Sequence, residues 1–234
     1  NIEVNGEVAQ LGAGNVVSGC YNSEFFPDDP LCSLFERGQT LDPFAIDTVR
    51  DSFVNVNSQR NEGVDVTIGI THDLGKLGTL SFSGQMTWQI KDTIALFEGT
   101  EVSTNGETGE PKWVGDFNLQ WRKDDWSILY SLDVIGKTND EQDFLDANGT
   151  LCPTSSIYGN YCVDLRAGAK FYHTASVSKK FSHFRITAGV SNIFDTHPPR
   201  LSVVSGPSSF GQSVVASQYD YTGRRGFVNL TTNF

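Results

Sequence analysis

The sequence predicts an all-β protein whose antiparallel strands, about eight in number, form a segment of a transmembrane β-barrel. Three observations predict this fold class. Apolar and polar residues alternate over long runs, short turns alternate with long loops, and the four tryptophans fall near the ends of the expected strands. These features are typical of strands that face lipid on one side and a polar interior on the other.

The clearest strand pair is a hairpin at Gly63–Ile90. Mostly apolar residues occupy alternate positions from Val64 to Ile70 and again, after a turn at Asp73–Gly78, from Leu80 onward. Its second arm keeps this pattern for about a dozen residues, whereas an ordinary strand has about 5–6 and a transmembrane strand needs about 9–11. The length therefore favours a membrane strand over the alternative, an arm of a large soluble sandwich.

The chain before this hairpin is less regular. Asn1–Gly6 is expected to be the end of a strand, and Val8–Cys20 a short helical or irregular stretch. Cys20–Pro43 contains three prolines and is expected to be a loop. Ile46–Gln59 alternates again, and we expect it to continue into Glu62–His72 as one long or bulged strand.

Five further strands follow the hairpin. They are expected at Lys112–Trp121, Trp126–Val134, Ala167–Lys179, Phe184–Ser191 and Gly226–Phe234. The connections between strands are alternately short and long. The short ones are Asp73–Gly78, Lys123–Asp125 and Lys180–His183, and the long ones are Asp92–Pro111, Lys137–Leu165 and Asp195–Thr222. Outer-membrane barrels have short periplasmic turns and longer extracellular loops, which is the same alternation.

The tryptophans provide an independent test. If the short turns are periplasmic, Trp88 and Trp113 lie at the outer ends of their strands, and Trp121 and Trp126 lie at the inner ends. All four share the phase of the apolar residues. Because indole combines an apolar body with a polar N–H, we expect these residues to form the aromatic girdles at the two membrane interfaces. Burial in the core of a sandwich is the alternative, but it gives no reason for placement at strand ends.

The alternation also predicts which side chains share a face of the sheet. We expect one set to face lipid: Val66, Phe82, Leu119 and Leu132. We expect the other to face the interior of the barrel: Thr67, Ser83, Asn118 and Asp133.

The net charge of the 234 residues is −11, and the acidic residues are concentrated in two loops. Asp92–Pro111 and Asn139–Leu165 contain no Lys or Arg. A nucleic-acid partner is not expected, because it requires a basic surface. The acidic residues either solvate long loops or form a face that attracts cations. No run approaches the roughly 18 apolar residues of a membrane helix.

The four cysteines form two close pairs in turn-rich stretches, Cys20 with Cys32 and Cys152 with Cys162. Local disulfides are the expected pairing, and they indicate an oxidising compartment. Zinc binding is the alternative, but its cysteines stand about two to four residues apart, much closer than these.

Four short motifs occur in the order found in one family. The segment Gly189–Asp195 reads G-V-S-N-I-F-D and precedes Pro198-Pro199, Tyr219-Asp220 precedes Gly223-Arg224, Asn57 precedes Gly63-Val64-Asp65, and Cys20-Tyr21-Asn22 precedes Cys32. With these motifs the chain resembles, over essentially its whole length, the C-terminal part of a TonB-dependent outer-membrane receptor. The cysteine-bearing loop is similar to that of a proteobacterial subset.

The resemblance implies that residues 1–234 are part of a 22-stranded barrel, with the plug domain and the N-terminal strands outside this chain. The expected location is the outer membrane of a Gram-negative bacterium, in contact with lipid and lipopolysaccharide. The resemblance also implies that the barrel-assembly machinery reads the last strand, here Val228, Leu230 and Phe234, although Phe234 could serve only as an interface anchor. That strand should pair with a strand outside these residues.

The function implied is import of a scarce nutrient, such as a ferric siderophore, cobalamin or a glycan, with energy from the TonB complex. No cofactor, metal site or catalytic group is expected, because the four histidines are scattered. Candidate ligand contacts are aromatic residues of the outer loops: Phe97, Phe144, Tyr158, Tyr161, Phe210 and Tyr219. The alternatives are a small self-contained barrel with a structural or adhesive role and a secreted glycan-binding sandwich.

Overall fold

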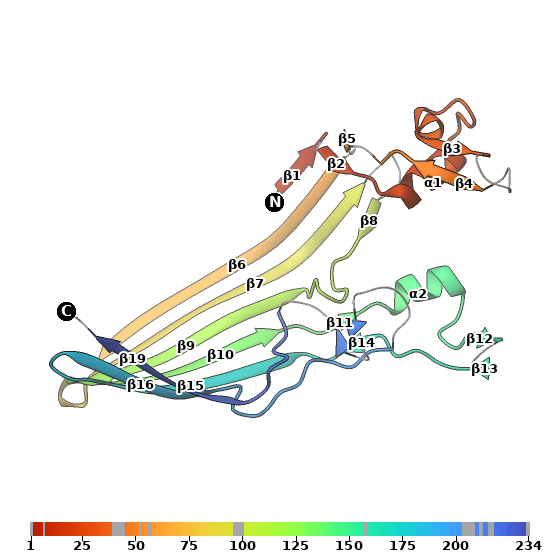
Figure 1. Cartoon of the computed structure of the whole chain (residues 1–234). Helices are drawn as coiled ribbons and strands as arrows, with labels where there is room; N and C mark the ends of the chain where they lie inside the picture. Colours follow the sequence, from red (N-terminus) through yellow and green to blue (C-terminus); the bar gives the residue numbers. More distant parts are fainter. Residues whose placement is uncertain are drawn as a thin grey trace. The chain divides into compact units, whose positions relative to one another are not determined.

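The structure is a computed structural model that describes residues 2–6, 8–38, 45–51, 53–55, 58–95, 101–156, 159–202, 209–210, 213–214 and 218–232. The chain divides into two compact units (Figure 1). The first contains Asn1–Glu62 and Lys91–Ser103, and the second contains Gly63–Ile90 and Thr104–Phe234.

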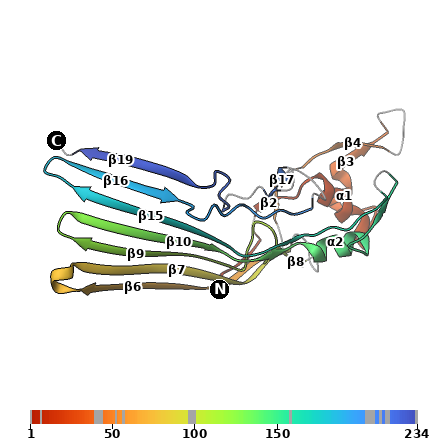
Figure 2. The ribbon, with the colours of Figure 1, turned by 90° about the horizontal axis from the view of Figure 1, so that it is seen from below.

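One antiparallel sheet dominates the structure, which confirms the predicted fold class. In spatial order its strands are β1 (Ile2–Asn5), β6 (Ser58–Asp73), β7 (Thr79–Ala95), β9 (Trp113–Lys123), β10 (Trp126–Ile135), β15 (Lys170–Lys180), β16 (Phe184–Ser191) and β19 (Arg225–Thr232). The short strand β8 (Glu101–Ser103) pairs with the end of β7. Figure 2 shows β6 to β19 side by side in this order. The strands and hairpin turns predicted from Gly63 onward are therefore confirmed in the described residues, with shifts at the strand ends.

The turn between β6 and β7 depends on local backbone geometry. It contains the 3-10 turn η2 (Gly75–Leu77), and the Leu74 amide donates a hydrogen bond to the Gly78 carbonyl at 2.8 Å. Gly78 has a φ of 94°, and a Cβ there would stand 2.2 Å from the Arg122 carbonyl oxygen. Only glycine combines this backbone conformation with so close an approach of the neighbouring strand.

The first unit contains two small antiparallel strand pairs that the sequence did not predict. Strand β2 (Val8–Gln10) pairs with β5 (Phe53–Asn55), and β3 (Phe35–Arg37) pairs with β4 (Ile46–Val49). The prediction of one strand running from Ile46 to His72 is therefore wrong. After β4 the Arg50 amide donates to the Leu34 carbonyl, and the Asp51 carboxylate accepts from the Gly12 amide.

The stretch left open as helical or irregular contains the helix α1 (Ala13–Asn22), and the 3-10 turn η1 (Pro30–Leu34) follows it. The predicted disulfide between Cys20 and Cys32 joins the two and is confirmed. None of the helices in the described residues is long and apolar enough to cross a membrane.

The stretches expected to be loops contain regular structure, such as η1 and β3 in Cys20–Pro43. β7 continues to Ala95, beyond the predicted end at Ile90, because β8 pairs with it there. Lys137–Leu165 contains the helix α2 (Glu141–Asn148), which has acidic residues in its first turn and a left-handed Gly149 at its end.

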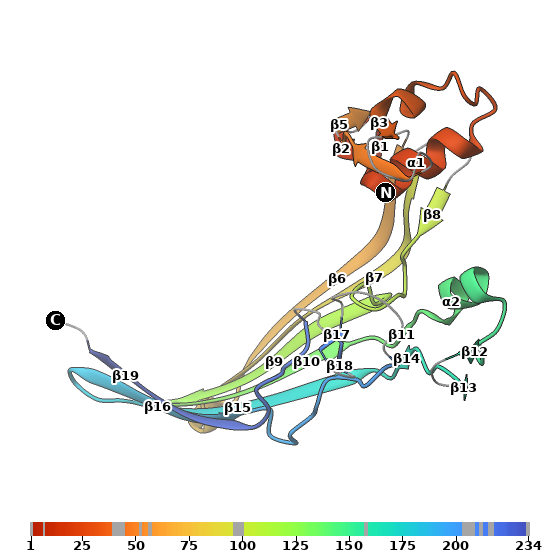
Figure 3. The same cartoon turned by 45° about the vertical axis from the view of Figure 1, so that its right-hand side comes forward.

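Short strand pairs flank this helix and lie beyond the ends of β10 and β15, away from the hairpin turns (Figure 3). β11 (Thr138–Asn139) pairs with β14 (Arg166–Ala167), and β12 (Thr154–Ser155) pairs with β13 (Gly159–Asn160). The predicted disulfide between Cys152 and Cys162 lies beside β12 and β13 and is confirmed. β17 (Ser209–Phe210) and β18 (Ser213–Val214) form a further short pair within the last long loop.

The strand register places the two predicted sets of side chains on opposite faces of the sheet. Leu119 lies directly opposite Phe82, and Asn118 lies directly opposite Ser83. Leu132 and Asp133 follow the same phases on β10. The Thr87 hydroxyl of β7 donates to Asp65 of β6 at 2.6 Å, so Asp65 shares the face of Thr87 and Ser83. The odd-numbered residues of β6, Thr67 included, therefore lie on this face, and Val66 lies on the face of Phe82. We call these the polar face and the apolar face.

The two faces differ in how their side chains are satisfied. On the polar face, hydroxyl and amide groups of neighbouring strands bond to each other, as in Ser131 with Asn118 at 2.6 Å and Ser178 with Thr187 at 2.7 Å. On the apolar face, large side chains remain uncovered, and Val66 and Val228 are 56% and 73% exposed. Such a continuous uncovered apolar surface requires lipid or a partner.

The tryptophans lie on the apolar face near the two ends of the strands. Trp88 and Trp113 are directly opposite each other near the ends that lead to the long loops. Trp121 and Trp126 flank the short β9–β10 turn, and the Lys179 ammonium group stands 4.6 Å from the Trp126 ring centre. Trp113 and Trp121 are about 26 Å apart along β9 at about 3.3 Å per residue. This separation matches the height of an apolar band of about 25 Å.

Val66 and Thr67 offer a matched test of the two faces. In the intact protein folded in lipid vesicles, Val66→Arg should lower the free energy of unfolding by about 2–4 kcal/mol, because the cation would face hydrocarbon. Thr67→Arg, on the polar face of the same strand, should change it far less. Urea unfolding measures both, and an equal loss in the two variants would contradict the assignment of the faces.

Candidate functional site

The polar face carries a pocket of about 510 Å³ at the end of the strands that leads to the long loops. Its walls include Asp133 of β10, Tyr172 and Thr174 of β15, and Arg225 of β19, and the segment Gln218–Thr222 lies across it. Its volume falls in the range of about 300–1,000 Å³ that is typical of small-molecule sites.

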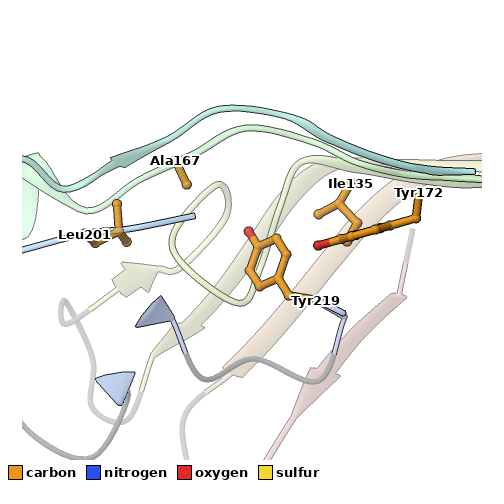
Figure 4. Packing of buried hydrophobic residues seen from close by; sticks show 5 residues of the cluster. All are labelled: Ile135, Ala167, Tyr172, Leu201 and Tyr219. Carbon is orange, nitrogen blue, oxygen red and sulfur yellow. The ribbon is translucent and has the colours of Figure 1, made fainter. Parts of the chain in front are cut away.

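A small apolar cluster holds the covering segment in place. Ile135, Ala167, Tyr172, Leu201 and Tyr219 pack together, and Figure 4 shows the Tyr172 hydroxyl beside Ile135 and pointing towards Tyr219. Tyr219 is only 4% exposed. Ile135 and Tyr172 stand in the polar phase of their strands, so Tyr219 covers apolar atoms that would otherwise be exposed on the polar face.

Asn192 joins the end of β16 to this covering segment. Its side chain is 2% exposed, accepts a hydrogen bond from the Thr196 amide at 2.7 Å and donates to the Thr196 carbonyl at 2.9 Å. Its amide nitrogen also contacts an Asp220 carboxylate oxygen at 3.4 Å. Because a buried amide group must be satisfied, the chain is fixed at both sides of the loop.

Asp195 makes a second connection between the same two segments. The Arg224 amide donates to the Asp195 carboxylate at 2.8 Å. Gly223 has a φ of 73°, and a Cβ there would stand 2.8 Å from the same carboxylate oxygen. The short sequence Gly223-Arg224 is therefore required for the approach of Asp195.

Asp220 is held in its charged form by its neighbours. Partial burial raises its pKa, but hydrogen bonds from the Thr222 hydroxyl and amide and the Arg225 guanidinium outweigh this effect and lower the pKa to about 2. Arg225 Nη1 lies 2.9 and 2.8 Å from the two carboxylate oxygens. The charge of Arg225 is thereby neutralised within the pocket.

A comparison with protein families identifies the chain. The family model for the β-barrel of TonB dependent receptor-like proteins matches residues 1–193. The chain belongs to the TonB-dependent receptor family. This family consists of transport receptors and not of enzymes, in agreement with the prediction. Among curated proteins, no sequence matches the chain.

Solved structures of another TonB-dependent receptor show the same fold. A mutant of the ferric enterobactin receptor PfeA from Pseudomonas aeruginosa, in complex with enterobactin, is 16% identical, with a TM-score of 0.57 over 99% of this chain. A second PfeA mutant gives 16% identity and a TM-score of 0.53 over 86% of this chain. The chain spans 28% and 26% of the length of these two receptors. At this identity the likeness supports the fold and not the ligand.

Two of the four motifs that suggested the TonB-dependent receptor family contain the residues that connect the two sides of the last loop. Asn192 and Asp195 belong to the first motif, and Asp220, Gly223 and Arg224 belong to the second. Their hydrogen bonds to each other give the resemblance a structural basis.

Of the predicted ligand contacts whose side chains the structure describes, Tyr219 alone lines the pocket. Phe144 lies half-buried on α2, and Tyr161 lies exposed beside the second disulfide. Phe97, Tyr158 and the side chain of Phe210 fall outside the described residues. The prediction missed Tyr172 and Arg225. Tyr172 could have been found from the sequence, because it is an aromatic residue in the polar phase of its strand.

The described part of the chain contains no cluster of metal-binding side chains. No group of three or more His, Cys, Asp or Glu side chains there is arranged to hold a metal ion. His173 lies on the apolar face against Tyr130 and Phe194.

Acidic residues gather where the loop after β8 meets α2. The Thr108 amide donates to Asp140 at 2.6 Å, and the Asn139 amide donates to the Gly106 carbonyl at 2.9 Å. Burial, followed by repulsion from Asp143 and Asp140, raises the pKa of Glu107 to about 7. The contact between this loop and α2 therefore brings carboxyl groups together.

Gly223 allows a test of the connection between the two motifs. Gly223→Ala should increase hydrogen exchange at the Thr196 and Arg224 amides, because the new methyl group displaces Asp195 and the left-handed backbone is strained. Gly168→Ala is the control, since a Cβ at Gly168 meets no atom within 4 Å. Unchanged protection in the Gly223 variant would contradict this role.

The contact at Glu107 should depend on pH. A carboxyl whose pKa is higher in the folded state than its ordinary value of 4.5 favours that state below pH 4.5 and loses this contribution as the pH rises to about 7. Protection of the Thr108 amide, corrected for intrinsic exchange, should fall over this range. Glu107→Gln should remove the fall and Glu110→Gln should retain most of it. If the protection of the Thr108 amide still fell in Glu107→Gln, another group would be responsible for the pH dependence.

Proposed function

We propose that the intact protein is an active-transport receptor in the outer membrane of a Gram-negative bacterium. In this proposal residues 1–234 form the C-terminal part of the barrel, and the plug domain and the N-terminal strands lie outside this chain. The observation that carries the proposal is the single sheet with one uncovered apolar face and one hydrogen-bonded polar face, in a chain that belongs to the TonB-dependent receptor family.

The apolar face is proposed to contact membrane lipid, with lipopolysaccharide in the outer leaflet. Trp88 and Trp113 would form the outer aromatic girdle, and Trp121 and Trp126 the inner one. Their positions at opposite ends of the strands support this assignment.

The edges of the sheet support a larger barrel. In the described residues, β1 and β19 are the two ends of the strand order. An unpaired edge in lipid leaves backbone groups without hydrogen bonds, at several kcal/mol each. We therefore propose that β19 pairs with a strand outside these residues. The barrel-assembly machinery would read Val228 and Leu230, which are 73% and 65% exposed, together with Phe234, which lies outside the described residues.

The transported substrate is proposed to be a scarce nutrient too large for porins, such as a ferric siderophore, cobalamin or a glycan. The plug would connect the receptor to the TonB complex, which supplies the energy. Tyr219 and the other predicted aromatic residues of the outer loops remain proposed ligand contacts. The uncovered apolar face disfavours the alternative of a secreted sandwich, whose sheets cover each other. The open edges disfavour a small self-contained barrel.

Uptake by intact cells tests this function. Cells with and without the intact protein are supplied with labelled ferric siderophores, cobalamin or glycan oligomers. Uptake of one class should be saturable, should require the protein, and should be lost when TonB is absent. Uptake that needs the protein but persists without TonB would contradict the proposal, as would uptake of none of the three classes.

A further inference from the structure

We infer that the pocket on the polar face binds a positively charged organic group of the ligand, either a protonated amine or a guanidinium. This inference rests on the proposed receptor function, because it assumes that ligands reach the polar face. It deepens that function by naming the chemistry of a ligand group. Neither the family nor the similar structures assign it.

Two carboxylates without a counter-charge stand at and beside the pocket. Asp133 of β10 lies directly opposite Asp116 of β9, and both side chains are exposed on the polar face. Like charges directly opposite each other destabilise a sheet. Neither forms an ion pair with a basic group in the described part of the chain. A bound cation would remove this repulsion.

The basic residue of the pocket is already neutralised. Arg225 is the one Lys or Arg among the described lining residues. Its guanidinium lies 2.8 Å from one oxygen of Asp220 and 2.9 Å from the other. The charge that remains for a ligand therefore comes from Asp133 and, behind it, Asp116. This balance disfavours an anionic group.

Tyr172 supplies a second, independent feature. It is 6% exposed, lines the pocket and lies directly opposite Asp133. Its hydroxyl lies near the Asp220 backbone but has no hydrogen-bond partner within normal distance and angle limits. A buried hydroxyl without a partner costs free energy, and an ammonium or guanidinium N–H that reached it would supply one, because a phenol oxygen accepts hydrogen bonds.

The aromatic rings favour an organic cation over a metal ion. Tyr172, Tyr219 and Tyr221 all line the pocket, and ring faces attract organic cations. The described residues contain no group of carboxylates and histidines arranged for a metal. Asp140 of the acidic loop also acts electrostatically on Tyr219. Of the two interpretations of the acidic loops, the face that attracts cations is the one this pocket supports.

Calorimetric titration of spermidine into the intact protein in detergent micelles tests the inference. Spermidine should bind, and triacetylated spermidine, which lacks the charges, should not. Asp133→Asn keeps the shape of the side chain and removes its charge. It should weaken binding about tenfold or more, because a hydrogen bond to a charged group contributes about 1.5–3 kcal/mol. Asp65→Asn is the control, since Asp65 lies on the same face but outside the pocket.

Three results would overturn the inference: no spermidine binding by the wild type, equal binding by Asp133→Asn, or equal binding of the acetylated probe. Heat-modifiable migration establishes that the variants are folded, and Asp116→Asn, outside the pocket lining, should weaken binding by a smaller factor. Binding does not depend on TonB, so a negative uptake experiment with intact spermidine binding would reject the proposed function alone. TonB-dependent uptake by the wild type, together with unchanged spermidine binding by Asp133→Asn, would reject this inference alone.

Discussion

The register of the strand pairs is the constraint on which the rest of this structure depends. Side chains alternate between faces with a period of two, so a slip of one residue would exchange the apolar and polar faces of a whole strand. Here the pairs Phe82 with Leu119 and Ser83 with Asn118 fix the register on both faces at once. Cross-strand hydrogen bonds such as Ser131 to Asn118 would be lost after a slip, and polar groups would face lipid.

The same register accounts for what the sequence could predict. The long strands β6, β7, β9, β10, β15, β16 and β19 follow the period-two pattern over eight or more residues, and every second connection between them is a short turn, so their order and faces were predictable. The small strand pairs of the first unit were not predictable. β3, β4 and β5 have three or four residues each, too few for a periodic signal. Single contacts such as Arg50 to Leu34 determine where they end.

Helix α2 and the extension of β7 were missed for a related reason. Lys137–Leu165 is polar and acidic, which resembles a solvated loop in composition. Its helix depends on end effects: acidic side chains in the first turn and a left-handed Gly149 at the end. β7 extends to Ala95 because β8 pairs with it, and a partner of three residues leaves no pattern in the sequence.

The pocket could be predicted in part only, because it forms where the period-two pattern fails. Ile135 and Tyr172 are large residues in the polar phase, and they need a cover. Tyr219 covers them. Ordering the segment that carries Tyr219 costs conformational entropy, which favourable contacts must offset. The hydrogen bonds of Asn192, Asp195 and Asp220 provide part of that offset. The resulting site is lined by strand residues and by the hydrogen-bonded segment Gln218–Thr222, and Asp133 remains exposed in it. Because the two motifs that hold the loop lie far from Asp133 in the sequence, only the folded structure brings the three together.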